Sequence, residues 1–417
     1  MVVLQKRKMS FGQGKNKIPV LTYIAILAVC FIINLPGVAV TPVEGKMKEL
    51  LHTSELEIQL LTILPNFVII PFVLLAGKLS DYKHKIPLIV FALLLFTGCG
   101  VTYLLVNSMT GLIVISCLLG VADGILIPFA MGFIVNSFEG KYRTRNLGIK
   151  SATSNFGTVV ASFIVGFLIQ NDNWHLPFAV YLVSILPLAL CYWLKYIPGF
   201  GTIPLSPASY QVTEEHLTGK GIDSGKIWGL IGNNVFFTFI TFTVVIYLPQ
   251  LLQNYGWNPK ISAEITAFFF ICVLVSGFFL ERFIKSLHSF VFPVLGLMLV
   301  VGLSLFYFIK AEWAMYCGSV FVGMAFGIFQ PLIYDKTSYA VVDPKKNIFG
   351  LSLVLTALYI GIAIEPFVIT GIVKIFHITD ENVFAFSLGF YLSIAYMIIA
   401  FFCRKRFTFS IEPSYYS

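Results

Sequence analysis

Two carboxyl residues, Asp123 and Glu365, lie inside long apolar stretches of the chain. A charged side chain is costly in the hydrocarbon of a bilayer, so an acid at that depth is a candidate functional group. A carboxyl that changes between its neutral and charged forms carries a proton, and we expect Asp123, with Glu365 second, to exchange protons. The alternative is a structural carboxyl that binds a nearby hydroxyl or amide.

The composition places these acids in a membrane. The chain has 417 residues, of which 58% are hydrophobic and 12% are charged, whereas soluble domains carry about 25% charged residues. A membrane-spanning helix needs about 20 apolar residues, and we predict twelve such helices. The predicted spans are residues 19–43, 57–77, 87–106, 111–136, 148–169, 176–197, 227–251, 261–281, 288–309, 313–334, 349–376 and 383–403.

The two halves of this hydrophobic chain repeat each other. Residues 120–128 (Gly-Val-Ala-Asp-Gly-Ile-Leu-Ile-Pro) return as residues 323–331 (Gly-Met-Ala-Phe-Gly-Ile-Phe-Gln-Pro). Gly77, with an acid four residues later, also has a counterpart in the second half. Internal repeats of this kind build membrane transporters whose site lies between the repeats. We therefore predict an all-α membrane protein with a first six-helix bundle, a cytoplasmic linker and a second six-helix bundle, residues 1–198, 199–226 and 227–417.

The 28 Lys and Arg residues segregate by loop. When the N-terminus is placed in the cytoplasm, nearly all of them fall in inner loops and tails, as the positive-inside rule requires. Both termini are thus predicted to be cytoplasmic. The net charge of +8 is a topology signal with some attraction to anionic lipid, not a sign of nucleic-acid binding. The first span lacks a cleavage site, and we expect a bacterial inner-membrane protein. The outer loops hold only Lys46, Lys48, Lys260, Lys310 and Lys374.

The sequence offers no pattern typical of an enzyme. Its seven cysteines have no metal-type spacing. It contains no phosphate-cradling Gly-Lys-Ser/Thr loop and no nucleophile motif with a base partner. We predict a protein without cofactor, metal or enzymatic activity.

The loop after the second predicted span reads Gly77-Lys-Leu79-Ser-Asp81-Tyr-Lys-His-Lys85. It resembles the cytoplasmic signature of the major facilitator superfamily, Gly-x-Leu-Ala-Asp-Arg-x-Gly-Arg-Lys, with a Tyr and a His at the usual Arg and second Gly. Gly77 permits two helices to approach closely, and Asp81 can accept hydrogen bonds from a helix N-terminus. The resemblance implies a cytoplasmic gate motif in which Asp81 latches the halves at the start of span 11, near Asn347. The alternative is a solvated loop charge.

The resemblance also implies two pseudo-symmetric bundles that work as a monomer by rocker-switch alternating access. The family's span 4 signature, Leu-x-x-Arg-x-x-Gln-Gly, is kept here only at Gly120, and Ser116 stands at the Arg. Asp123 follows Ser116 by two helical turns and shares its face, so it faces the central cavity if the family's Arg does. Span 5 carries a degenerate antiporter signature between Gly157 and Gly166. That signature favours the branch that exports drugs and metabolites.

In this family, spans 1, 4, 7 and 10 line the central cavity. Taken singly, each polar residue there is more often interhelical glue, worth about 1 kcal/mol, than a ligand contact. No Arg or Lys stands at mid-span, which disfavours small multivalent anions as substrates. Together the candidates describe a largely apolar cavity with aromatic walls: Asn34, Ser116, Asp123, Asn155, Asn234, Thr238, Thr241, Phe326, Gln330 and Tyr334.

The leading functional prediction is a secondary transporter that couples the entry of protons to the export of amphiphilic drugs or metabolites. The first alternative is an importer, by symport or facilitation, of a small polar metabolite such as a sugar or nucleoside. The second alternative is a membrane receptor that transports nothing. The short outer loops argue against a receptor, because they leave no room for an extracellular domain.

Overall fold

The computed structural model describes most of the chain, and its helices lie where the apolar runs predict them. A short antiparallel pair of strands, β1 (Ser10–Phe11) and β2 (Ile18–Pro19), precedes the first helix. The described residues are 10–11, 18–36, 39–40, 47, 51, 53, 55–79, 85–138, 140–168, 173–194, 221–257, 259–341, 343 and 346–411.

The N-terminal half is a bundle of helices that are apolar along most of their length. A 3-10 helix, η3, runs directly into α7, and the two together form the predicted sixth span. Ser108 caps the start of α5 by accepting a hydrogen bond from the amide of Gly111. The elements are α1 (Val20–Ile32), α3 (Glu55–Lys78), α4 (Lys85–Tyr103), α5 (Met109–Ser137), α6 (Gly140–Leu168), η3 (Leu176–Ser184) and α7 (Ile185–Leu194).

The C-terminal half repeats this arrangement. Asp223 caps the start of α8, and Asp380 caps the start of α13, each through hydrogen bonds from backbone amides to its carboxylate. Such caps satisfy donors that the first turn of a helix leaves without partners. The elements are α8 (Ser224–Asn254), α9 (Pro259–Leu287), η5 (His288–Phe290), α10 (Val291–Phe308), α11 (Glu312–Ala340), α12 (Asn347–Phe376) and α13 (Glu381–Phe402).

The predicted membrane spans agree with these helices. Among the described residues, eight helical segments are long and apolar enough to cross a membrane. One of them, Glu264–Phe308, includes most of α9 and all of α10, and two shorter apolar helices are Val20–Ile32 and Leu64–Lys78. The remaining span is α6, whose first turns are the charged sequence Gly-Lys-Tyr-Arg-Thr-Arg. The prediction of an all-α protein with twelve spans in two bundles is confirmed.

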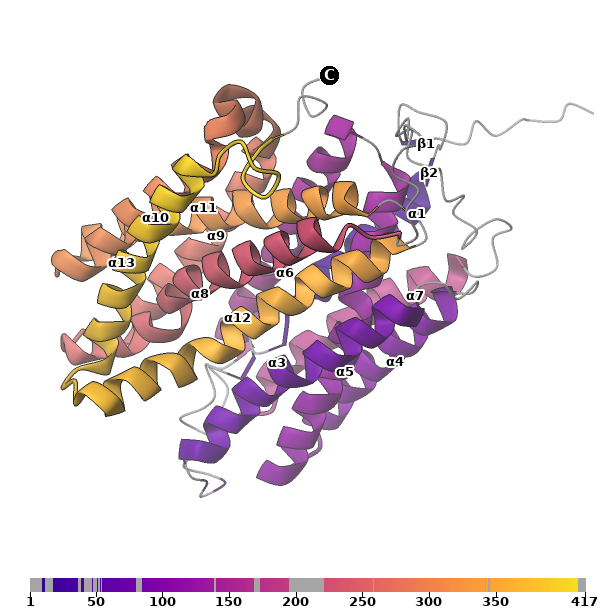
Figure 1. Cartoon of the computed structure of the whole chain (residues 1–417). Helices are drawn as coiled ribbons and strands as arrows, with labels where there is room; N and C mark the ends of the chain where they lie inside the picture. The colour runs from indigo at the N-terminus through magenta and orange to yellow at the C-terminus, as the bar shows by residue number, and fades with distance from the viewer. Residues whose placement is uncertain are drawn as a thin grey trace, which may run out of the picture.

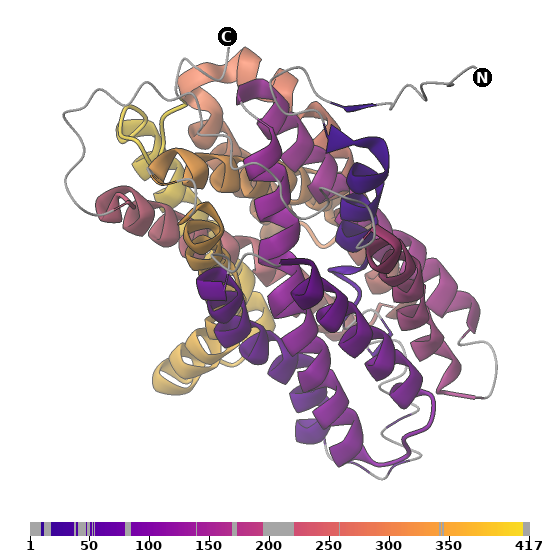
Figure 2. The ribbon, with the colours of Figure 1, turned by 90° about the vertical axis from the view of Figure 1, so that its right-hand side faces the viewer.

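The two halves lie side by side, with the N-terminal helices in indigo to magenta and the C-terminal helices in rose to yellow (Figures 1 and 2). Helix α3 of the N-terminal half packs along α12 of the C-terminal half, and α6 packs along α9 in the same way. Each pair therefore takes one helix from each half. We call the end of the molecule where α5 ends and α12 begins the linker end, because residues 221–223, just before α8, lie there too. Helix α8 begins at Ser224, within the last residues predicted as linker.

Glycines allow the two helices of each pair to approach each other closely. A Cβ atom added to Gly77 in α3 would lie 2.5 Å from the hydroxyl of Ser352 in α12. A Cβ on Gly148 in α6 would lie 2.5 Å from the carbonyl oxygen of Gly277 in α9, and one on Gly277 would lie 2.8 Å from the carbonyl oxygen of Gly148. Small residues of this kind allow helices in a membrane to pack backbone against backbone.

Candidate functional site

Asp123 lies on α5 at the boundary between the two halves. Its neighbours Gly120 and Gly124 both pack against α3, which fixes the position of this turn. The Asp123 side chain is buried, and its Oδ1 atom has no hydrogen-bond partner in the part of the chain that the structure describes. Tyr359, which belongs to α12 of the other half, is close enough to interact electrostatically with Asp123 and with Tyr334 of α11. Tyr359 thus brings a phenol of the other half into electrostatic range of this carboxyl.

Glu365 lies on α12, inside the C-terminal half. It is fully buried, and neither carboxylate oxygen has a hydrogen-bond partner among the described residues. Thr243 of α8 is nearby, but its hydroxyl donates to the carbonyl oxygen of Phe239 at 3.4 Å. Tyr247, one turn further along α8, interacts electrostatically with both Glu365 and Glu381. Glu365 thus faces α8 from α12, with Thr243 and Tyr247 as its polar neighbours.

The two predicted proton carriers therefore have different surroundings. A buried polar group without a hydrogen bond costs about 1–3 kcal/mol, and such groups in a native structure call for an explanation. At Asp123 a conformational change that separates the halves would alter the surroundings of the carboxyl. At Glu365 the neighbours belong to the same half.

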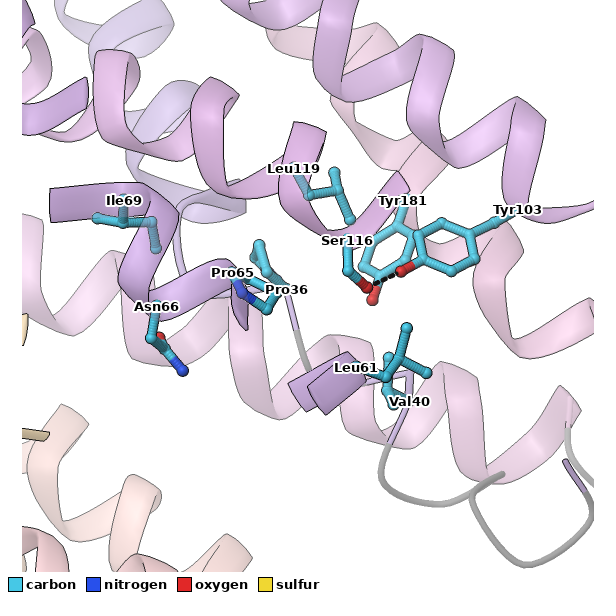
Figure 3. Close-up of a pocket in the computed structure, with 10 residues that line it drawn as sticks. All are labelled: Pro36, Val40, Leu61, Pro65, Asn66, Ile69, Tyr103, Ser116, Leu119 and Tyr181. Atoms are coloured by element: carbon cyan, nitrogen blue, oxygen red, sulfur yellow. Dashed lines mark hydrogen bonds between the residues drawn. The ribbon is translucent and has the colours of Figure 1, made fainter. Parts of the chain in front are cut away.

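A cavity of about 90 Å³ lies inside the N-terminal half. Figure 3 shows the hydroxyl groups of Ser116, Tyr103 and Tyr181 gathered on one side of it. Ser116 and Tyr103 share a short hydrogen bond, and the ring of Tyr103 stacks on Phe178 at 4.5 Å between centroids. Ser116 is therefore bound to its own half. The lining residues are Pro36, Val40, Leu61, Pro65, Asn66, Ile69, Tyr103, Ser116, Leu119 and Tyr181.

Three predicted cavity residues form one network in the core of the C-terminal half. The amide of Gln330 in α11 donates to Asn234 Oδ1 at 3.1 Å and to the hydroxyl of Thr238 at 3.3 Å, both in α8. Asn234 in turn donates to the carbonyl oxygen of Val354 in α12 at 2.7 Å. Asn234 and Thr238 are fully buried. This network ties α8, α11 and α12 together, which is the interhelical role that we weighed against ligand binding.

The other predicted cavity residues are dispersed. Thr241 is buried and donates to the carbonyl oxygen of Phe237 on its own helix at 2.9 Å, and Asn155 donates to the carbonyl oxygen of Ser151 at 2.8 Å. Phe326 packs edge-on against Phe242, with 5.6 Å between ring centroids. Tyr334 is buried, and Asn34 is exposed just beyond α1. The structure brings Asp123 and Tyr334 together around Tyr359, and it does not bring Asn34 or Asn155 into that group.

A buried ion pair joins the halves at the linker end. The Nε of Arg143, near the start of α6, donates to Asp335 Oδ1 in α11 at 2.8 Å, and the hydroxyl of Thr144 donates to the other carboxylate oxygen. The guanidinium also lies 4.5 Å from the ring centroid of Tyr339. We call Arg143, Thr144 and Asp335 the clasp. From the sequence alone Arg143 is only a loop charge, and the acid Asp335 directly after the predicted span 313–334 is the signal that could have indicated its partner.

The end of α5 and the start of α12 also meet, in a contact that has no ion pair among the described residues. Asn347, at the start of α12, donates to Asn136 near the end of α5 at 3.2 Å, and Gly132 packs against Ile348. Thus the end of α5 meets the start of α12, as the end of α11 meets the start of α6. Only the second of these two contacts carries an ion pair among the described residues.

The predicted gate motif lies partly outside the described residues. Gly77 packs against Ser352 near the start of α12, and Leu79 is exposed. Lys85 begins α4. Asp81 lies outside the described residues, so its latch to α12 stays a prediction.

Comparisons with known proteins agree with this architecture. The family model of the Major Facilitator Superfamily matches residues 22–366. The chain is 30% identical over 118 residues to the multidrug transporter protein MdtP of Bacillus subtilis (strain 168), a match that covers 28% of this chain and 21% of that protein. It is 25% identical over 308 residues to the quinolone resistance protein NorA of Staphylococcus aureus (strain N315), covering 71% of this chain and 75% of that protein.

Solved structures show the same fold. The proton:xylose symporter XylE, bound to 6-bromo-6-deoxy-D-glucose, superposes with a TM-score of 0.72 at 14% identity, over 91% of this chain and 94% of that one. The transporter FucP, in the outward conformation, gives a TM-score of 0.66 at 13% identity, over 91% and 98% of the two chains. The family model covers most of the chain, and the twelve-helix architecture agrees with it. The chain therefore belongs to the Major Facilitator Superfamily and is an integral membrane transporter, not an enzyme.

Proposed function

We propose that this transporter exports amphiphilic drugs or metabolites in exchange for protons, by alternating access in a bacterial inner membrane. The observation that carries the proposal is Asp123, a buried carboxyl whose Oδ1 has no hydrogen-bond partner among the described residues and which interacts electrostatically with Tyr359 of the other half. An intramembrane acid of this kind is a functional group by default. Its place at the boundary means that a change in its charge acts on the contact between the halves.

The surroundings of Asp123 favour an amphiphilic substrate. The neighbouring side chains Tyr359 and Tyr334 are aromatic, and the amide nitrogen of Gln330 is engaged in hydrogen bonds within the C-terminal half. A lipophilic cation would pair with the ionised Asp123 and pack on these rings, because aromatic faces attract cations. The names of NorA and MdtP refer to quinolone resistance and multidrug transport in those proteins, which supports the same substrate class here.

The proton and the substrate would then compete for one carboxyl. A neutral Asp123 can be enclosed between the halves at little cost, whereas an ionised one needs a cation beside it. Exchange between the two open states would occur only when Asp123 carries a proton or faces a cationic substrate. This rule couples the two fluxes, because the empty, ionised transporter cannot close. Glu365 would hold a second proton inside the C-terminal half.

We assign the linker end to the cytoplasm, with both chain termini on that side, from the distribution of Lys and Arg. The clasp and the contact between Asn136 and Asn347 hold this end together, which would leave the transporter facing outward. The Asp81 latch fits the same state. Lys346, at the N-cap of α12, provides no side-chain hydrogen bond to that helix start, and a carboxylate from the loop after α3 would be favoured there.

Ligand-induced thermal stabilisation of the detergent-purified protein tests the proposal. Lipophilic cations, neutral amphiphiles, sugars and nucleosides would be compared at about pH 5.5 and about pH 8, since any ligand of the folded state raises its apparent stability. We expect the cations to stabilise the protein more at the higher pH, and Asp123→Asn to remove that difference. Glu312→Gln, at an exposed acid in α11, is the matched control and should behave as the wild type.

Other outcomes would contradict the proposal. If only a sugar or nucleoside stabilises the protein, with no effect of pH, the exporter is replaced by an importer of that metabolite. If the Asp123→Asn variant keeps the pH dependence of cation binding, Asp123 is not the group for which protons and substrate compete.

A further inference from the structure

The residues that follow α13 fold back onto the linker end of the C-terminal half. We call Cys403–Ile411 the C-terminal strap. Its backbone forms tight turns, in which the amides of Phe409 and Ser410 donate to the carbonyl oxygen of Arg406 at 2.9 Å and 2.8 Å. The ring of Phe409 packs edge-on against Phe292 of α10, with 5.9 Å between centroids. The strap is therefore an ordered part of this half.

Lys336 connects the strap to α11. This lysine is only 1% exposed, and its Nζ donates to the carbonyl oxygen of Ser410 at 2.5 Å. The same ammonium lies 4.4 Å from the ring centroid of Phe407, and the ammonium of Lys226 in α8 lies 4.8 Å from that ring. A buried ammonium is costly unless it is paired or hydrogen-bonded, so the strap supplies contacts that Lys336 needs.

Lys336 is also the residue next to Asp335, which makes the ion pair with Arg143 of the other half. A few residues further on, the amide of Asp223 donates to the carbonyl oxygen of Ala340 at 3.0 Å, which ties the start of α8 to the end of α11. The last turns of α11 are thus held by the N-terminal half, by the strap and by the segment before α8. Asp335 and Lys336 point their opposite charges to partners in different parts of the chain.

We propose that Lys336 is a positioning residue for the clasp: it anchors the C-terminal strap, and the strap fixes the end of α11 so that Asp335 meets Arg143. The strap thereby favours closure of the halves at the linker end. This inference rests on the proposed alternating access, in which that end opens and closes. Coupling between two contacts is reciprocal, so closure of the clasp also holds the strap in place.

Amide hydrogen exchange, followed by mass spectrometry on the full-length protein in detergent, tests this without any substrate. The informative segment is residues 144–150 of α6, which belong to the N-terminal half and lie beside the clasp. Lys336→Met keeps most of the side-chain volume and removes the charge, and Phe407→Ala weakens the strap from its other side. The matched control is Lys285→Met, at an exposed lysine paired with Glu281 on α9.

We expect Lys336→Met and Phe407→Ala to raise exchange in residues 144–150 by about fivefold, the lower end of usual coupling strengths, and Lys285→Met to leave it unchanged. Lys336→Arg, which keeps the charge, should restore much of the protection. In an Arg143→Met background, which lacks the ion pair, Lys336→Met should add nothing further. Helix α4, remote from the clasp, serves as the internal reference for global unfolding.

Two results would overturn the inference. In the first, the strap exchanges faster in Lys336→Met while residues 144–150 keep their wild-type rate, so the strap and the clasp are independent. In the second, the effect of Lys336→Met persists in full without Arg143, so it does not act through the ion pair. Because neither readout involves transport, failure of the exporter proposal would leave this result standing.

Discussion

Arg143 and Asp335, 192 residues apart in the chain, form a 2.8 Å ion pair that bridges the two halves of the transporter. The ion pair joins the start of α6 to the end of α11. The corresponding contact between the end of α5 and the start of α12 is the neutral hydrogen bond from Asn347 to Asn136. The duplicated architecture therefore places corresponding helix ends together twice but gives them different chemistry. One side of the linker end is held by charge and the other by amide and apolar contacts.

Breaking the ion pair from either side should destabilise the closed linker end. Arg143→Met removes the cation that pairs with the buried carboxylate of Asp335, and Asp335→Asn removes the anion that pairs with the guanidinium of Arg143. Loss of one partner of a buried pair costs about 3–5 kcal/mol. Thermal unfolding in detergent should show a large fall for each single variant. The double variant Arg143→Met with Asp335→Leu should lose less than the sum, and strict additivity would mean that the pair contributes no coupling.

Substitution at Asp123 should separate transport from its dependence on pH. With Asp123→Asn, neither a proton nor a cation can bind the side chain as a carboxylate would, so efflux of a fluorescent lipophilic cation should lose its response to a proton gradient. The assay is dye movement in proteoliposomes with an imposed gradient, between about pH 5 and pH 8, a range in which buried carboxyls can titrate. Glu312→Gln is the control. Equal gradient-driven transport by Asp123→Asn and the wild type would rule out the proposed role.

Substitution of Glu365 should change the stability of the protein and its transport activity in opposite directions. Its two oxygens lack hydrogen bonds among the described residues, so Glu365→Met should make the protein more stable, by about 1–3 kcal/mol, since an apolar side chain avoids the cost of an unpaired buried group. Gradient-driven transport should fall in the same variant. If stability drops instead, the carboxyl is a structural group with partners, and its proposed proton role loses its basis.

The contact between α3 and α12 predicts a steric rescue. Gly77→Ala places a methyl group 2.5 Å from the hydroxyl oxygen of Ser352, and overpacking of this kind costs about 1–3 kcal/mol. Ser352→Gly in the same chain should restore the wild-type unfolding temperature. Gly98→Ala on α4, where a Cβ meets nothing within 4 Å, should be neutral. An equal loss at Gly77 and Gly98 would point to helix propensity as the cause.

Substitution of Gln330 should show whether this residue contributes to helix packing or to ligand binding. Its hydrogen bonds to Asn234 and Thr238 join α11 to α8, so Gln330→Leu should lower stability by about 1 kcal/mol and leave the apparent affinity for a lipophilic cation unchanged. Stability would be followed by thermal unfolding, and affinity by titration at constant pH. A tenfold loss of affinity at unchanged stability would return this residue to the substrate cavity.

The sequence was sufficient to predict the helices because a span in lipid requires a long apolar run, and most of the helices contain one. It also predicted the two halves, because the repeat around Gly120 keeps its spacing in the second half. Asn234 and Thr238 share a helix face, as predicted, but that face turns toward α11 and α12 of the same half. The direction of a face depends on the packing of several helices, and helical periodicity alone does not contain that information.

The clasp escaped prediction for a related reason. Arg143 stands in a run of basic residues that the positive-inside rule explains without any partner, and Asp335 follows an apolar span whose repeat-mate has a glycine at that position. Only the arrangement of α6 beside α11 brings them together. Asp123 was found from sequence because a lone acid in an apolar run stands out without any knowledge of its neighbours.

At the contact between Gly148 and Gly277, backbone packs on backbone with no side chain between the two helices. Side chains that interdigitate must be withdrawn before two surfaces can turn against each other, whereas two glycine surfaces have nothing to withdraw. Relative rotation of α6 and α9 at this point therefore requires no change of rotamer. In the part of the chain that the structure describes, the ion pair of the clasp and the Asp123 carboxyl both lie at the boundary between the halves. Under the proposed alternating access, a change of charge at either place would therefore act on the movement of both bundles.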